Sequence, residues 1–533
     1  MRKAKARSRA WMWIAAVALV PRLLVIFTYG PHMSLHSDDA GYYRSAVWFL
    51  QSGTLSYYTP AKPTLHMMPG ITLLLAAIIA LFGQGALGLY VGKIVFALIG
   101  TAGVVGAYKA IGKMTSPAFA AIVALAIALY PPSVEIDTLF LTEPLFMATF
   151  AWAFYYLLKL EQTKALRDLL WLSIFFMLAM YVRPNVALWA VIGVLYLAAK
   201  RYPRRLLIRH AGIAVVIGIV FMLPWWVRNE IVFHKFILLT DDSWNPLLLG
   251  TFQGQGYPPL TNEGAVEHQL LREHPNLRPQ RLHELPWFAL EKQVAIQRIR
   301  EWLKANPQSF WRTYLWLKPQ ILWLRAYLPI PIFGIKGVQL FSLQRWLVYV
   351  SIIGHFVAMV FAKGRRLELL LVWVSLLYFT LLFCVFFAFE RYNVPIEWLM
   401  LMGALQDFGL LCVGFCVPCQ NTSGGVDQRR GGRDRAQDDT AIAPGRDSRV
   451  ASVTKRVARR QRMRSWLSRG IRVGCPSARR SLRCQARLRT PGLVVFLSLD
   501  TVEEKRPFAR LIELANWPRL SFVPGTRFRW RSR

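Results

Sequence analysis

Asp38 and Asp39 follow the first long apolar run of the chain, residues 11–28, and begin an amphipathic stretch. That run is long enough for the ~30 Å hydrocarbon core of a bilayer. Charged residues beside a membrane span are usually cations that bind headgroups, so an acidic pair there needs another explanation. A carboxylate at this boundary can take a proton from an acceptor while a lipid-borne donor approaches from the membrane. The pair therefore predicts general-base chemistry at a membrane surface.

Further ionisable groups lie at the ends of other apolar runs. Arginine offers a rigid fork of donors that matches phosphate oxygens, and a carboxylate can act as a general base. With the topology argued below, these groups fall on the outer face of the membrane, which suits a site for a phosphorylated substrate. They are Lys62, His66, Glu135, Asp137, Glu143, Arg183, Asn185, Arg228, Asn229, Glu390, Arg391 and Tyr392.

Each of these groups also has a purely structural interpretation. Asp38 and Asp39 can stabilise the first turn of a helix that Gly53 ends, because acidic residues are favoured at helix N-termini. Glu143 can be a first-turn acid of the span that follows it. The arginines at helix ends can reach headgroups, and a single histidine such as His66 is more often a hydrogen-bonded structural residue. No single motif decides between the two interpretations.

The elements that must position these groups are membrane-spanning helices. The chain has 533 residues, of which 55% are hydrophobic, with 20 Trp and a mean hydropathy of +0.33. This composition excludes an ordinary soluble protein. The net charge of +36 lies largely beyond residue 417 and in short loops, so no nucleic-acid partner is expected. The apolar runs are 11–28, 88–108, 118–132, 143–159, 169–182, 185–199, 209–226, 343–362, 367–389 and 395–417.

The basic connections between these runs determine the topology. With a cytoplasmic N-terminus and ten crossings, every Lys- and Arg-rich connection falls inside, as the positive-inside rule requires. Residues 70–83 must then lie in the interface or re-enter, since this run is short for a span. We therefore predict an all-α polytopic membrane protein with about ten transmembrane helices and a helical loop on the outer face.

Four regions follow from this topology. We expect a catalytic membrane module over 1–225 with a first outer loop over 29–87, and a soluble segment on the outer face over 226–342. The soluble segment is expected to be a helical lid that shapes the acceptor pocket. C-terminal membrane helices follow over 343–417. The Arg-rich tail, 418–533, loses membrane-protein composition abruptly, and we interpret it as disordered or non-native sequence, for example from out-of-frame translation.

Several short motifs in order along the chain resemble those of a known family. They are Asp38-Asp39-Ala-Gly-Tyr42-Tyr43, His66-Met-Met-Pro69, Leu141-Thr-Glu143-Pro, Arg183-Pro-Asn, Pro224-Trp-Trp-Val-Arg228-Asn229 and Glu390-Arg391-Tyr392-Asn-Val-Pro395. This series is similar to the motifs of GT-C membrane glycosyltransferases. It resembles most the bacterial branch of the dolichyl-phosphate-mannose protein mannosyltransferase superfamily, which includes lipid A aminoarabinose transferases. The resemblance covers residues from about 10 to 405. Met67-Met68 and Asp39 depart from the usual pattern.

The resemblance implies an inverting transfer of a monosaccharide from a polyprenyl-phosphate donor to a lipid, protein or polysaccharide hydroxyl. It places the enzyme in the bacterial inner membrane, with the active site on the outer face. By motif position, Asp38 is the general base with Asp39 beside it, and Glu143 positions substrate or a divalent cation, the one cofactor that the resemblance allows. The expected donor-phosphate residues are Lys62, Arg183, Arg228 and Arg391. The expected substrate-binding residues are Tyr42, Tyr43, His66, Asn229 and Tyr392.

A membrane transporter or flippase of lipid-linked sugars is the alternative function. Such a protein would share the apolar helices and the basic loops. It should also place ionisable residues deep inside its spans, near the middle of the bilayer. Here the apolar runs contain few charges, with Arg22 as an exception, and the ionisable residues gather at the ends of the runs. The sequence therefore favours the transferase.

Overall fold

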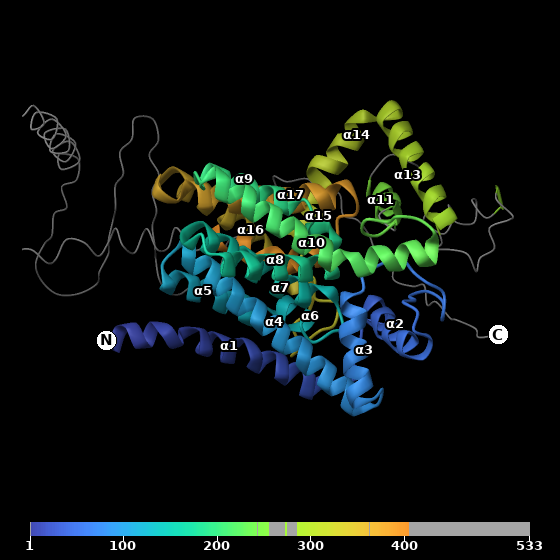
Figure 1. Ribbon diagram of the computed structural model, residues 1–533, viewed down its shortest axis with the longest axis horizontal. Coiled ribbons are helices and arrows are strands. Elements are labelled where there is room, and N and C mark those ends of the chain that lie inside the picture. Colours follow the sequence, from blue (N-terminus) through green and yellow to red (C-terminus); the bar gives the residue numbers. More distant parts are fainter. Residues whose placement is uncertain (1, 242–243, 255–271, 274–284, 362, 404–533) are drawn as a thin grey trace, which may run out of the picture. The chain divides into compact units, whose positions relative to one another are not determined.

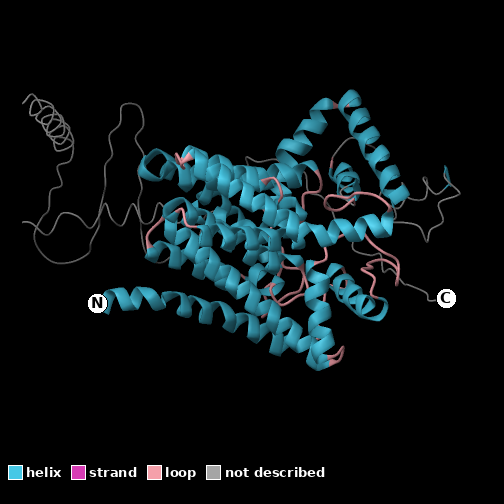
Figure 2. Cartoon of the chain, viewed as in Figure 1, coloured by secondary structure: helices cyan, strands magenta, loops and turns pink. Residues whose placement is uncertain are grey.

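The computed structural model describes residues 2–241, 244–254, 272–273, 285–361 and 363–403. Within these ranges every regular element is a helix, and the connections are loops or turns (Figure 2). The predicted all-α class is confirmed. The Arg-rich tail, 418–533, and most of the last predicted span, 395–417, lie outside the described residues.

The centre of the bundle is formed by α4 (Ala86–Met114) and α7 (Thr142–Thr163), which pack side by side. The helix α4 also contacts α1 (Arg2–Tyr29) and α5 (Pro117–Leu129), and α7 contacts α8 (Leu166–Val182). Figure 1 shows these helices running roughly along one direction. Each lies on a predicted apolar run, so the hydropathy pattern located them correctly.

Close approach of α4 and α7 depends on glycine. A Cβ atom on Gly103 would lie 3.1 Å from the backbone nitrogen of Ala148, and one on Gly106 would lie 3.1 Å from the indole of Trp152. Small residues at such positions let two helix backbones approach within van der Waals distance, which is how helices associate inside a membrane. The two helices therefore form the tightly packed core that carries the site described below.

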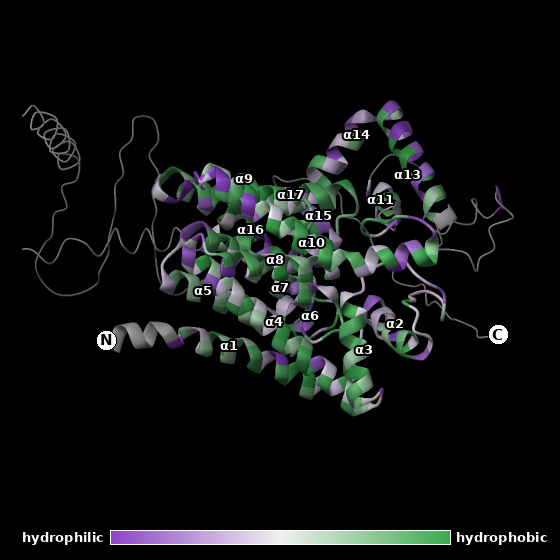
Figure 3. Ribbon diagram, viewed as in Figure 1, coloured by the Kyte–Doolittle hydropathy of each residue, from purple (hydrophilic) through white to green (hydrophobic). Residues whose placement is uncertain are grey.

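Four more helices complete the bundle: α9 (Trp189–Ala199), α10 (Arg204–Phe233), α16 (Gly337–Phe361) and α17 (Arg366–Val385). Hydrophobic residues predominate along most of the bundle helices (Figure 3). Among the described residues, five helices are long and apolar enough to cross a membrane: α1 from Arg9, α4, α10, α16 and α17. The chain is a multi-pass membrane protein, as predicted.

At one end of the bundle, α2 (Asp38–Ser52) and α3 (Gly70–Phe82) pack against each other. Figure 1 shows α3 at the end of the bundle, at a large angle to α4. With 13 residues, α3 is only about 20 Å long and too short for the hydrocarbon core. This agrees with the prediction that residues 70–83 do not cross. Gly53, with φ of 67°, ends α2 in the left-handed conformation, as the sequence predicted.

Short and irregular elements make up the described part of the 226–342 segment. They are α11 (Trp244–Gly250), η2 (Thr251–Gln253), α13 (Leu285–Ala305), α14 (Pro307–Arg312), the π-helical η4 (Thr313–Leu317) and α15 (Lys318–Trp323). The helical character expected of this segment is found in α13, α14, η4 and α15. Residues 255–271 and 274–284 lie outside the described residues.

A buried ion pair fixes α1 against the short helix α6 (Pro131–Ile136). The side chain of Arg22 is fully buried, and its Nε donates to Oδ2 of Asp137 at 2.7 Å. Its other nitrogens donate to Ser133 Oγ at 3.1 Å and to the carbonyls of Ala18 and Ala128. All of these partners are needed, because an unpaired buried guanidinium would be strongly destabilising. This pair explains the single basic residue inside the first apolar run.

Replacing Arg22 by Met should therefore destabilise the protein by about 3–5 kcal/mol, because Asp137 is left buried and charged without a cation. The double variant Arg22→Met/Asp137→Asn should recover much of this loss. Unfolding midpoints in one detergent measure both effects. A double variant no more stable than the single one would contradict the ion-pair interpretation.

Candidate active site

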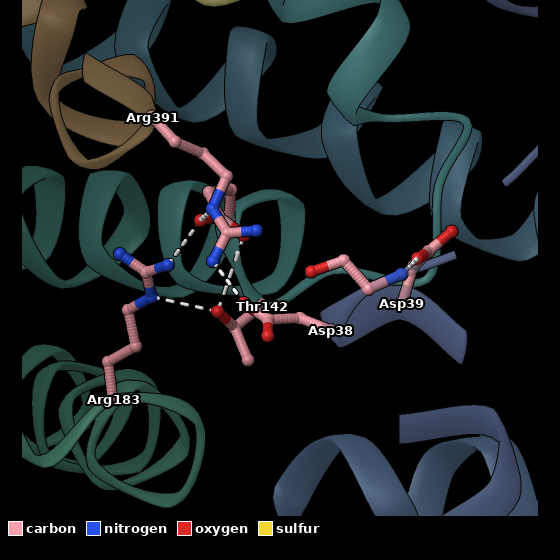
Figure 4. A network of polar contacts seen from close by, with 7 residues as sticks. Asp38, Asp39, Thr142, Arg183 and Arg391 are labelled. Carbon is pink, nitrogen blue, oxygen red and sulfur yellow. Dashed lines mark hydrogen bonds and ion pairs between the residues drawn. The ribbon is translucent and has the colours of Figure 1, made fainter. Parts of the chain in front are cut away.

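Five polar side chains from four separate parts of the chain meet at the α2–α3 end of the bundle (Figure 4). The residues come from the start of α2, the start of α7, the residue after α8, and the short helix η6 (Glu390–Ile396). They are Asp38, Thr142, Glu143, Arg183 and Arg391, called the charge cluster below. Four of the five were predicted as site residues; Thr142 was not.

Glu143 is the centre of the charge cluster. Its side chain is 1% exposed, and its Oε1 accepts a hydrogen bond from Nη2 of Arg183. The Nε of Arg391 lies 2.9 Å from the same oxygen. Thr142 Oγ1 accepts from Nε of Arg183 at 2.9 Å and donates to Glu143 Oε2 at 3.3 Å. The Glu143 carboxylate therefore holds two guanidinium groups, which suits a positioning role better than proton transfer.

Asp38 is the exposed member of the charge cluster. Its side chain is 37% exposed, whereas that of Arg391, which donates to Oδ2 of Asp38, is only 8% exposed. Burial acts to raise the pKa of Asp38, but the charge and hydrogen bond of Arg391, helped by His66 and Arg183, leave it below its ordinary value. Asp38 is thus an ionised carboxylate with access to the surroundings of the site.

Asp39 has a different environment from its neighbour. Its side chain points into the preceding loop, where Oδ2 accepts from the backbone N–H of Leu35 at 2.9 Å and Oδ1 accepts from Ser37 at 3.2 Å. The residue is 3% exposed. Both oxygens therefore order the loop that leads into α2. This geometry supports the structural interpretation for Asp39 and the chemical one for Asp38.

Aromatic residues surround the charge cluster. The ring of Tyr392 lies 5.3 Å from the Arg183 guanidinium, and cation–π contact of this kind keeps a guanidinium in place. His66 accepts or donates a hydrogen bond with Tyr58 at 3.0 Å and lies against Tyr57, which also packs on Tyr42. The charge of His66 helps to lower the pKa of Asp38, and burial together with the charge of Asp38 raises the pKa of Tyr42.

The remaining predicted site residues lie elsewhere. Tyr43 donates to the carbonyl of Gln84 at 3.1 Å and stacks on Phe140. Arg228 donates to the carbonyl of Thr64 at 3.1 Å and to Oδ1 of Asn229 at 2.9 Å.

The amide of Asn229 donates in turn to the carbonyl of Ile237 at 3.3 Å, and Lys62 lies exposed in the first loop. Among the described residues, no hydrogen bond or ion pair joins Arg228 or Asn229 to the charge cluster. Arg228 instead holds the loop between α2 and α3 against α10.

Two residues in or near the charge cluster, Thr142 and Tyr327, were not predicted from the sequence. Thr142 stands beside Glu143 in the Leu141-Thr-Glu143 motif, and that adjacency was the available signal. Tyr327 faces Arg391, whose guanidinium lies 5.9 Å from its ring. Burial raises the pKa of Tyr327 to about 12, so it stays a neutral phenol. No sequence pattern marks Tyr327, because it lies in an irregular stretch between α15 and α16.

The carboxylates present do not fit a divalent cation. Asp38 and Glu143 both bind Arg391, so a guanidinium already occupies the position between them. In the part of the chain that the structure describes, no group of three His, Cys, Asp or Glu side chains is arranged to hold a metal ion. We therefore assign no chemical step of this site to a metal.

A second buried carboxyl, Glu135, lies on α6 beside the site. It is fully buried, and its Oε1 accepts from the backbone N–H of Ile330 at 2.9 Å, which joins α6 to the end of the 226–342 segment. No cation pairs with it among the described residues. Burial raises its pKa to about 8, although the Ile330 hydrogen bond acts in the opposite direction. Glu135 is therefore protonated at neutral pH in the folded protein.

Comparison with known families supports the motif analysis. Residues 62–227 match the family model described as dolichyl-phosphate-mannose-protein mannosyltransferase, which is less than a third of the chain. This range contains His66, Glu143 and Arg183. The match confirms the predicted resemblance to this glycosyltransferase superfamily. No curated protein matches the chain.

Three solved structures show a distant likeness. The oligosaccharyltransferase of Archaeoglobus fulgidus in the apo form has a TM-score of 0.48 and 14% identity, over 77% of this chain and 51% of that chain. AglB from the same organism, in complex with an inhibitory peptide and a dolichol-phosphate, has a TM-score of 0.44 and 15% identity, over 78% and 52%. ArnT from Cupriavidus metallidurans bound to undecaprenyl phosphate has a TM-score of 0.36 and 16% identity, over 76% and 78%. The chain spans about half the length of the archaeal proteins, and with TM-scores below 0.5 no role is assigned from these likenesses.

The protonated state of Glu135 has a consequence for stability. The folded protein keeps a proton that the unfolded chain releases above the ordinary pKa of 4.5. The retained proton stabilises the folded state by on the order of a few kcal/mol below pH 4.5. This stabilisation is lost as the pH rises from 4.5 toward about 8. Glu135→Gln keeps the acceptor oxygen without the titration, so its unfolding midpoint should fall less than that of the wild type between pH 5 and 8.5. Parallel curves would contradict the assignment.

Proposed function

We propose that the chain is an inverting glycosyltransferase. It moves a monosaccharide from a polyprenyl-phosphate donor to a hydroxyl group of a lipid, protein or polysaccharide acceptor, at the outer face of the bacterial inner membrane. One observation carries this proposal: a partly exposed, ionised carboxylate, Asp38, binds Arg391, one of two guanidinium groups that the buried carboxylate of Glu143 holds in place. A base and a phosphate-binding pair are the two components that such a transfer requires.

The reaction is a single displacement at the sugar. The acceptor oxygen forms a bond to the anomeric carbon as its proton passes to Asp38, and the bond from that carbon to the phosphate oxygen breaks. Polyprenyl phosphate leaves with the bonding electrons. Negative charge grows on the phosphate in the transition state, where Arg391 and Arg183 stabilise it with charge-assisted hydrogen bonds. One displacement inverts the anomeric configuration, so one base is sufficient.

The contact between Asp38 and Arg391 gives a way to prepare the base. In the structure, Nη2 of Arg391 donates to Asp38. A donor phosphate that takes over this nitrogen removes the strongest influence that lowers the pKa of Asp38. The pKa of Asp38 then rises, and a carboxylate of higher pKa is the better proton acceptor. Donor binding would thus activate the base for the acceptor that follows.

The orientation in the membrane is supported by the positions of the basic connections. The helix α7 begins at the charge cluster and runs for 22 residues, about 33 Å, to Thr163. The basic connection at its far end includes Lys159, which pairs with Asp168 at 2.8 Å. Basic connections stay on the cytoplasmic side. The charge cluster, at the other end of α7, then faces outward.

The first test is the replacement of Asp38 by Asn. Transfer from a purified polyprenyl-phosphate sugar should fall by about 10²–10⁴-fold, because the amide cannot accept the proton. The matched control is Asp241→Asn, which removes a carboxylate of the 226–342 segment that lies 3.6 Å from Lys235. Release of polyprenyl phosphate by variants in proteoliposomes measures the rate.

The control should retain the wild-type rate. Retained turnover in Asp38→Asn would show that another group is the base. Movement of intact lipid-linked sugar across proteoliposomes by the wild type, without release of polyprenyl phosphate, would establish the alternative transporter or flippase function.

A second test separates the arginines. Arg183 is held toward the charge cluster by Glu143 and Thr142, whereas Arg228 binds loop carbonyls. Arg183→Lys loses the forked geometry and should raise the donor KM by roughly tenfold or more. Arg228→Lys should change the donor KM much less. Initial rates at varied donor concentration measure both, and equal effects would mean that the two arginines share the phosphate.

A further inference from the structure

The stretch that carries Arg391 packs against α7 and against α15 of the 226–342 segment. It begins after α17, at Phe386, and continues into η6 through Asn393. Its backbone is not in regular hydrogen-bonded structure before η6. The position of Arg391 therefore depends on side chains that bind this backbone from outside.

Gln253, the last residue of η2, makes the most specific of these contacts. Its Nε2 donates to the carbonyl of Ala388 at 2.6 Å, and its Oε1 accepts from the backbone N–H of the same residue at 3.0 Å. Ala388 is 1% exposed. The amide side chain thus satisfies both polar groups of a buried residue, as a neighbouring peptide group would. Ala388 precedes Arg391 by only three positions.

Other contacts of the 226–342 segment hold the two ends of the same stretch. The Nζ of Lys318, a fully buried residue, donates to the carbonyl of Phe386 at 3.2 Å. A Cβ on Gly250 would lie 1.7 Å from that carbonyl oxygen, so α11 packs directly on it. Beyond Arg391, Nδ2 of Asn393 donates to the carbonyl of Leu322 at 2.6 Å. Anchors therefore lie before and after the arginine.

From these contacts we propose that Gln253 is a positioning residue for Arg391, so that the 226–342 segment sets the geometry of the donor-phosphate site as well as any acceptor pocket. This inference rests on the proposed function of the charge cluster. Arg391 must reach Asp38 and Glu143 together. Its guanidinium can do so only if the backbone three residues earlier is fixed, because a shift of about 1 Å in a positioning group can cost 10²-fold in rate.

The amide of Gln253 is required for both hydrogen bonds. A glutamate at this position has the same size, but its carboxylate cannot donate to the Ala388 carbonyl and would repel it. Gln253→Glu therefore replaces the donated hydrogen bond by repulsion with little change in volume, and Gln253→Ala removes both hydrogen bonds. A shift of Arg391 also weakens its effect on Asp38, whose pKa then rises. That change in titration is a consequence that a loss of general stability would not produce.

The experiment compares Gln253→Glu and Gln253→Ala with the wild-type chain in proteoliposomes. The matched controls are Gln297→Glu and Gln297→Ala, because Gln297 is an exposed glutamine of α13 whose amide contacts Glu301. Both Gln253 variants should lose on the order of 10²-fold in kcat/KM. The acid limb of their pH–rate profiles should move to higher pH, in addition to the fall in unfolding midpoint that loss of the buried Ala388 hydrogen bonds causes. The controls should match the wild type in all three measurements.

Binding of polyprenyl phosphate, measured by native mass spectrometry, gives a second result that does not need turnover. Binding should weaken by about tenfold or more in both Gln253 variants, because the guanidinium of Arg391 would no longer be placed to donate to the phosphate. A wild type that binds this lipid without transferring sugar would overturn the proposed function. The lipid affinities of the Gln253 variants would then still test whether Gln253 positions Arg391. A wild type that does not bind it would overturn both.

Two outcomes would overturn the inference while the proposed function stands. In the first, the Gln253 variants keep the wild-type rate, pH profile and lipid affinity. In the second, rate and unfolding midpoint fall together while the acid limb stays in place, which would make Gln253 a residue of general stability only.

Discussion

The interaction on which the site depends is the sharing of one buried carboxylate by two arginines. Glu143 is almost inaccessible to solvent, and its Oε1 contacts the guanidinium groups of both Arg183 and Arg391. Taking such charges out of water is costly, and removal of one partner would leave another uncompensated. The three elements that carry these residues, α7, the end of α8 and η6, are therefore held in a single arrangement. Asp38, the more accessible carboxylate, binds Arg391 and completes the balance of two positive and two negative charges.

The carboxylates at the site differ in burial, and burial distinguishes those that hold the structure from the one that a substrate could reach. Glu143 and Asp39 are buried and fully engaged, the first with arginines and the second with backbone N–H groups of its own loop. Asp38 keeps an exposed carboxylate. The Arg22–Asp137 pair follows the same rule at the α1–α6 contact, where burial of both partners leaves only a structural role. Exposure, and not residue type, distinguishes the group that can exchange a proton with a substrate.

The 226–342 segment was expected to be a lid that shapes the acceptor pocket. It also binds the stretch of chain that carries Arg391 of the charge cluster. In its described elements, Gln253 and Lys318 bind backbone groups of Ala388 and Phe386, and the Leu322 carbonyl accepts from the side chain of Asn393. Glu135 accepts a hydrogen bond from the backbone N–H of Ile330 in the same segment. The stretch that carries Arg391 is thus bound by a segment that lies in sequence between two groups of apolar helices.

By itself the sequence determined the elements and the kinds of chemistry. Apolar runs located the membrane helices, because hydrocarbon requires about 20 apolar residues with internal backbone hydrogen bonds. Acidic and basic motifs identified most of the charge cluster, because phosphate and proton transfer need those residue types. The tertiary structure decided which member of each type joins the charge cluster. Asp38 and Asp39 are adjacent and alike in sequence, yet Asp38 binds Arg391 and Asp39 binds its own loop. Arg183 follows the end of α8 and binds Glu143, whereas Arg228, inside α10, binds the carbonyl of Thr64. The contact of Gln253 with Ala388 spans 135 positions, and such pairings arise from packing between elements, which no local pattern records.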